Sequence, residues 1–204
     1  MIMGRLVEYF QNLNQGVVID RDIIYLLNAN TSYDIQYDRN GIWADCNFPL
    51  RSMKFNCIYV PWVPNYISRL QIYQGIDLLS TEFNGCYLGR YIHNNGNYYG
   101  CHIHSGNADK RAAWNNFLNA PHSTAFSPFT QELEIYTIAN LQNPQKRQFE
   151  TWGVISNTDR CYTVIVERIG VIRNNTPYGY DTRFHFIHDM ENIDIYRNRP
   201  IPTN

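Results

Sequence analysis

Residues 77–105, DLLSTEFNGCYLGRYIHNNGNYYGCHIHS, contain two apolar runs on either side of the tetrapeptide NNGN at 94–97. An Asn-Gly pair flanked by strand-forming residues is typical of a β-hairpin. The sequence therefore predicts that the chain folds back on itself here. The start of the first strand then lies beside the end of the second, so that Cys86 meets His102 and His104.

Hairpin pairing leaves the choice between the two histidines open. A two-residue loop would pair Cys86 with Ser105, whereas a three-residue loop would pair it with His104. His102 and His104 share one face of the strand, because side chains alternate between faces. His102 would then lie one diagonal step, roughly 7 Å, from Cys86. A thiol beside an imidazole is the minimum apparatus for nucleophilic cysteine chemistry, although a lone cysteine is more often a small core residue.

Composition limits the class of protein. The 204 residues suit one large domain, and a hydrophobic content of 44% excludes a disordered chain. The net charge of −1 gives no basic excess, so neither nucleic acid nor an anionic membrane is an expected partner. No apolar window is long enough for a membrane span.

Cysteine usage and the first residues of the sequence indicate a reduced compartment. Five cysteines are an odd number, and their spacing matches no zinc motif. The first sixteen residues, MIMGRLVEYFQNLNQG, lack the apolar run of a secretory signal. We therefore expect no signal peptide, no disulfide framework and no metal site.

The whole pattern predicts an α+β fold, with a mixed β-sandwich-like core and a few flanking helices in a single domain, residues 1–204. Helical spacing of apolar residues favours helices at 4–13 and 109–118, whereas 65–74 and 121–131 read as irregular. Besides the hairpin, strands are expected at 17–19, 23–27, 33–37, 42–48, 54–62, 152–156, 162–168, 171–173, 184–187 and 193–196.

The motif Phe83-Asn84-Gly85-Cys86, with His102 on the return strand, resembles the catalytic core of the cytotoxic necrotizing factor-type glutamine deamidases. That group includes Burkholderia lethal factor, and its core is a strand ending in small residues plus Gly-Cys, followed by a hairpin to a catalytic histidine. A family of chemotaxis-receptor glutamine deamidases is similar, with Gly-x-Cys and His-Ile at like spacing. One departure is Asn84, which stands where the group typically has serine.

The resemblance covers about residues 53–118. It includes an apolar strand that ends in Val60-Pro61-Trp62 and a segment after the histidine that carries Trp114. Alignment on His-Ile selects His102 as the catalytic histidine. Alignment on a His-small-Gly pattern selects His104 instead, and we favour His102.

The resemblance implies a protein-glutamine deamidase that acts through Cys86 and His102 without a metal or an organic cofactor. Ser80, six residues before the cysteine, matches a hydroxyl residue proposed to support the histidine, and backbone N–H groups near Gly85 would hold the oxyanion. His104 and Asn84 are further supporting positions.

A bacterial toxin or effector is the biological role that the resemblance implies. Its target would be a glutamine of a host GTPase or helicase. We expect a monomer that resides in the bacterial cytoplasm before delivery and in the host cytosol afterwards.

Three other interpretations remain open. A thiol protease or a transglutaminase would use the same Cys-His pair. A zinc site could draw on Cys101, His102 and His104, but adjacent strand residues point to opposite faces. A non-enzymatic binding module is the alternative from another class, and an unreactive Cys86 would indicate it.

Overall fold

The computed structural model describes residues 6, 10, 34–47, 57–83, 85–104, 112, 123–128, 147–173 and 176–189. These residues form eleven strands. In chain order they are β1 (Asp34–Tyr37), β2 (Trp43–Asn47), β3 (Cys57–Tyr59), β4 (Ile67–Ile72), β5 (Asp77–Ser80), β6 (Tyr87–Ile92), β7 (Tyr98–Ile103), β8 (Thr124–Phe126), β9 (Arg147–Ile155), β10 (Cys161–Arg173) and β11 (Thr176–Asp189).

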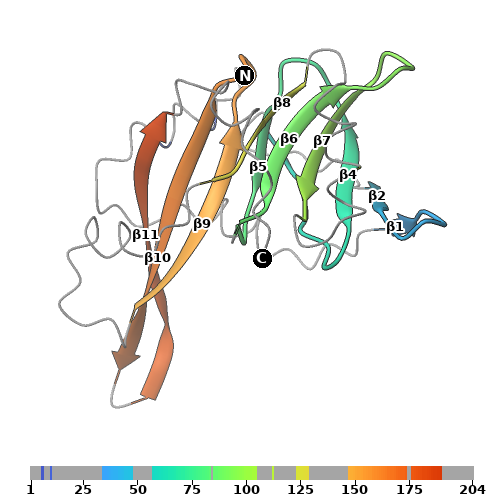
Figure 1. The fold of residues 1–204 in the computed structure, drawn as a ribbon. Coiled ribbons are helices and arrows are strands. Elements are labelled where there is room, and N and C mark those ends of the chain that lie inside the picture. The colour runs from blue at the N-terminus through green and yellow to red at the C-terminus, as the bar shows by residue number, and fades with distance from the viewer. Residues whose placement is uncertain are drawn as a thin grey trace.

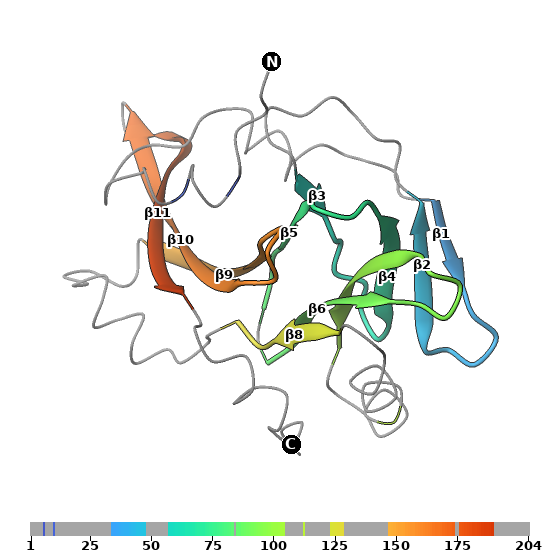
Figure 2. The same cartoon turned by 90° about the horizontal axis from the view of Figure 1, so that it is seen from above.

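The strands make two sheets that share an interior (Figure 1). One sheet has six strands in the order β1-β2-β4-β7-β6-β8, and the other has five in the order β11-β10-β9-β5-β3. Seen from above, the sheets curve around a common centre (Figure 2). The predicted hairpin forms β6 and β7 near the middle of the six-stranded sheet, so its inner face contributes to the core between the sheets.

Small residues allow the two sheets to approach closely. A Cβ atom added at Gly100 on β7 would lie 3.1 Å from both terminal methyls of Leu78 on β5 and 3.2 Å from Cγ2 of Val60. Leu78 and Val60 are both fully buried. A larger residue at position 100 would therefore force the sheets apart.

The predicted α+β class is wrong for the part of the chain that the structure describes, which is all β. Helical geometry occurs there only at the isolated positions Leu6, Phe10 and Ala112. The helices predicted at 4–13 and 109–118 otherwise lie outside the described residues. A mixed two-sheet core is present, because β2–β4 and β3–β5 pair in parallel and the other pairs are antiparallel.

Two strands were missed by the sequence patterns. The segment 65–74, expected to be irregular, forms β4, and the predicted loop 121–131 contains β8. The nearby Pro61 and Pro64 suggested that pairing ends. Pairing resumes because β4 lies between β2 and β7, which together satisfy its backbone groups on both sides.

The other strand predictions divide into two groups. Strands are confirmed within 33–37, 42–48, 54–62, 152–156 and 184–187, and the predicted runs 162–168 and 171–173 form the single strand β10. The strands predicted at 17–19, 23–27 and 193–196 lie outside the described residues. Within the described chain, no helix is long and apolar enough to cross a membrane.

Candidate active site

The β6–β7 hairpin has a three-residue loop, residues 94–96. The backbone N–H of His93 donates to the carbonyl of Asn97 at 2.9 Å, and that of Gly96 donates to the carbonyl of His93 at 2.8 Å. Gly96 has a φ of 82°, a left-handed conformation that glycine adopts without steric cost. Of the two loop lengths that the sequence left open, the structure has the longer one.

This loop length sets which side chains of the two strands share a face. Leu88 pairs with His102. Cys86 lies just before β6, two residues ahead of Leu88, and belongs to the same core cluster as Leu88. Extending the register to Cys86 places it one diagonal step from His102. The same register, extended by one position, places His104 opposite Cys86.

The His102 imidazole is held by a hydroxyl from the other sheet. Ser80, the last residue of β5, lies with its Oγ 2.8 Å from His102 Nδ1. The same Oγ donates to the backbone carbonyl of Val60 at 2.6 Å. Ser80 is fully buried and His102 is 1% exposed, so no solvent competes for these bonds.

These two bonds determine the tautomer of His102. A serine hydroxyl has a single hydrogen, and the Val60 carbonyl can only accept. Ser80 therefore donates to Val60 and accepts from an N–H at His102 Nδ1. The neutral ring then carries its lone pair at Nε2, which is the form that a general base requires.

The environment keeps this imidazole neutral. Burial, together with a smaller contribution from the neighbouring His104, lowers the pKa of His102 to about 3. Nε2 is buried and has no hydrogen-bond partner. Phe83 covers the ring, with centroids 4.3 Å apart and planes inclined by 1°.

Cys86 lies at the entrance to β6 and is 8% exposed, within the apolar core cluster. Its backbone carbonyl accepts a hydrogen bond from Ser127 Oγ at 3.2 Å. Because His102 Nε2 has no hydrogen-bond partner, the structure does not join the Cys86 thiol to the imidazole by a hydrogen bond. Catalytic hydrogen bonds often tighten only when substrate binds.

The residue before the cysteine adopts a conformation that suits glycine. Gly85 has a φ of 85°, and a Cβ built there would meet nothing within 4 Å. The backbone angle rather than a lack of space therefore selects glycine. Asn84 lies outside the described residues, and the predicted role of the Gly85 and Cys86 backbone as oxyanion donors stays a prediction.

The residues that support His102 were only partly predictable. The family resemblance predicts Ser80, whereas the sequence marks Val60 only as part of the end of an apolar strand. The sequence gives no indication that Phe83 stacks on His102, although Phe83 is part of the motif before Cys86. Ser68 pairs with His102 from β4 and donates to the carbonyl of Pro61, a contact that no local pattern indicates.

The cysteine and histidines of the zinc alternative do not converge. Cys101 is fully buried on the opposite face of the six-stranded sheet, in the cluster with Ile67 and Tyr87. Among the residues that the structure describes, no group of three histidine, cysteine or acidic side chains could hold a metal ion.

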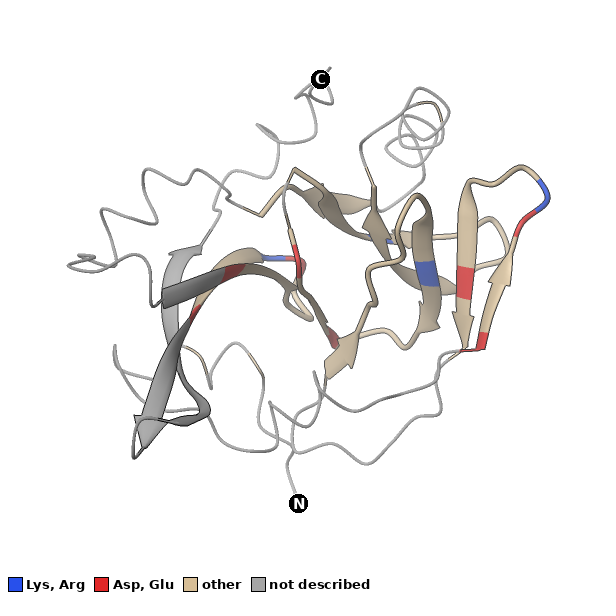
Figure 3. Cartoon of the chain, turned by 90° about the horizontal axis from the view of Figure 1, so that it is seen from below, with Lys and Arg blue, Asp and Glu red and all other residues tan. Residues whose placement is uncertain are grey.

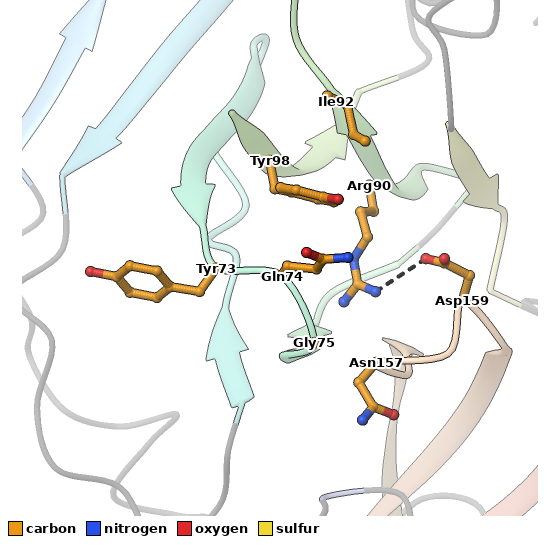
Figure 4. A pocket seen from close by; sticks show the side chains of 8 residues that line it. All are labelled: Tyr73, Gln74, Gly75, Arg90, Ile92, Tyr98, Asn157 and Asp159. Carbon is orange, nitrogen blue, oxygen red and sulfur yellow. Dashed lines mark hydrogen bonds and ion pairs between the residues drawn. The ribbon is translucent and has the colours of Figure 1, made fainter. Parts of the chain in front are cut away.

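The far end of the same hairpin carries a buried arginine. Arg90 Nη1 donates to the carbonyl of Ser156 at 2.9 Å and to Asp159 Oδ1 at 3.1 Å, and Nη2 donates to the carbonyl of Ile76. Arg90 thus ties β6 to the connection between β4 and β5 and to the turn between β9 and β10. It lines a cavity of about 340 Å³ (Figure 4), together with Tyr73, Gln74, Gly75, Ile92, Tyr98, Asn157 and Asp159.

Charge is scattered over the described strands. Figure 3 shows the arginines of the described strands apart from one another and interspersed with acidic residues. One partly exposed pair, Arg69 and Asp45, is in contact at 2.5 Å between β4 and β2.

Comparison of the chain with protein-family models, curated proteins and solved structures finds no match.

Proposed function

We propose that this chain is a cysteine-dependent protein-glutamine deamidase, with Cys86 as the nucleophile and His102 as the general base. The observation that carries the proposal is the Ser80 hydrogen bond to His102. With Nδ1 protonated, the lone pair of the neutral ring is at Nε2, the atom that we propose accepts the Cys86 proton. The resemblance of the Cys86 motif to glutamine deamidases supplies the substrate class.

The first half of the reaction forms a thioester. His102 Nε2 takes the thiol proton, and the Cys86 sulfur attacks the carbon of the glutamine carboxamide. Backbone N–H groups near Gly85 and Cys86 stabilise the oxyanion. The tetrahedral intermediate collapses, the C–N bond breaks, and the imidazolium gives its proton to the departing ammonia.

The second half regenerates the enzyme. His102 Nε2 removes a proton from water, and the resulting hydroxide attacks the thioester carbon. The C–S bond breaks, glutamate is released, and the thiolate recovers the proton from the imidazolium. Each turn consumes one water and releases one ammonia, so no metal, oxidant or organic cofactor is required.

Both groups are buried, which has a consequence for substrate. Because Cys86 is 8% exposed, a carboxamide reaches its sulfur only if the packing around the cysteine opens. This fits an enzyme that accepts glutamine from a particular protein surface rather than from solution. By the resemblance, we propose a bacterial toxin or effector that acts in a host cytosol on a GTPase or a helicase.

The proposal is tested by incubating the protein with a host-cell lysate and mapping glutamine-to-glutamate changes by mass spectrometry. Each event adds about one dalton, since an amide NH₂ becomes OH. We expect a few sites to change with the wild-type protein and none with Cys86→Ser. Cleaved peptides would indicate a thiol protease. Glutamines whose side chains have become linked to an amine would indicate a transglutaminase. Equal spectra with and without the wild-type protein would contradict all three.

A further inference from the structure

Phe83 does more than fill the core. Its ring is parallel to the His102 imidazole within 1°, at a centroid separation of 4.3 Å, and it is 5% exposed. Ser80 holds one edge of the same imidazole from only three residues earlier in the chain. One short segment therefore contacts the ring at two places, its face and its Nδ1 edge.

Contacts with β9 hold the Phe83 side chain in its position. A Cβ added at Gly153 on β9 would lie 3.1 Å from Phe83 Cε2, and 3.2 Å from a methyl of Leu88, the partner of His102. The backbone N–H of Phe83 donates to the carbonyl of Thr151 at 3.2 Å. The ring thus has little room to move between β9 and the imidazole.

The backbone of Glu82, the residue before Phe83, has a strained conformation. Glu82 has a φ of 63°, a left-handed value that residues with a side chain rarely adopt. It is held between two anchors, the Thr81 hydroxyl at 2.8 Å from Tyr59 OH and the Phe83 backbone bond to Thr151. Strain of this kind persists where the surrounding structure over-determines it, and it concentrates at functional sites.

We infer that Phe83 is a positioning residue, whose stacked ring keeps the His102 imidazole in the plane that directs Nε2 to the face shared with Cys86. The inference rests on the proposed function. Ser80 by itself leaves the imidazole able to tilt about the Nδ1 hydrogen bond, and a flat ring on its face removes that freedom. Phe83 also excludes water from the imidazole, which keeps the base neutral.

The experiment compares Phe83→Met with Phe126→Met. Methionine keeps most of the volume of phenylalanine but has no flat face. Phe126 on β8 is fully buried in the same core cluster, so its substitution matches the packing loss. Side-chain ¹⁵N shifts of His102 report its tautomer and protonation, and iodoacetamide reports the reactivity of Cys86.

We expect Phe83→Met to raise the pKa of His102 and to add signal from the other tautomer, while Phe126→Met leaves the His102 spectrum unchanged. Alkylation of Cys86 and deamidation should both fall on the order of a hundredfold in Phe83→Met, as for a misplaced catalytic group. Identical His102 spectra in wild type and Phe83→Met would overturn the inference and leave the deamidase proposal standing. An Nε2-protonated ring in the wild type would instead contradict the proposed base.

Discussion

Ser80 Oγ lies 2.8 Å from His102 Nδ1, although the two residues are 22 positions apart and belong to different sheets. The bond crosses the interior between the sheets, and the Val60 carbonyl determines its direction by taking the only serine hydrogen. A buried imidazole is thereby given one tautomer before any substrate arrives. Such preorganisation is what a general base requires, since reorganisation costs rate.

Removing the Ser80 hydroxyl should show how much activity depends on the orientation of the His102 imidazole, as distinct from the packing around it. Ser80→Ala leaves the buried Nδ1–H of His102 without an acceptor, which costs about 1–3 kcal/mol in the free energy of unfolding. We expect reduced deamidation together with a mixed tautomer in the ¹⁵N spectrum. Ser68→Ala is the matched control, because Ser68 is equally buried beside His102 but bonds to Pro61. Equal activity losses in the two variants would contradict the role of Ser80.

Cys86→Ser should abolish activity and preserve the fold. Serine is close in size but far less acidic, so the sulfur nucleophile is lost while packing is retained. We expect no deamidation, with a melting temperature near that of the wild type. Deamidation at the wild-type rate in Cys86→Ser would refute the enzymatic proposal.

Iodoacetamide should modify Cys86 before the other cysteines. Cys101 and Cys161 are fully buried, and burial raises the pKa of Cys46 to about 11 and that of Cys57 to about 12. Thiolate is the reactive form, so these four should label slowly at neutral pH. Peptide mapping of the alkylated protein checks this order. First labelling at any of these four cysteines would count against a reactive Cys86.

Alanine substitutions of His102 and of His104 should have very different effects on deamidation and on alkylation of Cys86. His102→Ala removes the ring that Ser80 and Phe83 hold, and deamidation should fall at least about a hundredfold, the low end for a general base. His104→Ala should leave alkylation of Cys86 at neutral pH close to the wild-type rate. The reverse pattern, in which only His104→Ala abolishes alkylation, would show that the residue directly opposite Cys86 is the base.

His102 should make stability depend on pH. Burial lowers its pKa to about 3 from an ordinary value of 6.5, so between these values the unfolded chain binds a proton that the folded chain excludes. The free energy of unfolding therefore decreases as pH falls below 6.5, with a slope approaching about 1.4 kcal/mol per pH unit. Urea unfolding of His102→Gln should show a smaller slope with pH than urea unfolding of the wild type. An unchanged slope in His102→Gln would contradict a buried neutral imidazole.

Arg90 should be important for stability. Arg90→Met leaves the carbonyls of Ser156 and Ile76 without a charged donor, and we expect a loss of about 3 kcal/mol in the free energy of unfolding. Asp159→Asn weakens only a pair whose carboxylate is 55% exposed, so it should cost less than about 1 kcal/mol. Equal losses in chemical denaturation would show that the ion pair, rather than the carbonyl bonds, is the stabilising contact.

Features that depend only on residues close together in the chain could be predicted from the amino-acid sequence. The Asn-Gly turn predicted the β6–β7 hairpin, because only a few residue types adopt its left-handed position, here Gly96. Alternation of side chains then predicted that Cys86 lies near His102 and His104. Periodicity does not report strand partners, so β4 and β8 were missed: each is completed by hydrogen bonds to strands distant in the chain.

The contacts between the two sheets could not be predicted in this way, because they depend on how distant strands pack together. The NNGN tetrapeptide is compatible with two loop lengths, and packing of the inner face selected the three-residue form that pairs Leu88 with His102. The tautomer of His102 depends on Ser80 and on Val60, which reach it from other strands. The stack of Phe83 depends on the space left by Gly153. No local pattern encodes these contacts, since each arises where separate strands meet in a core that excludes water.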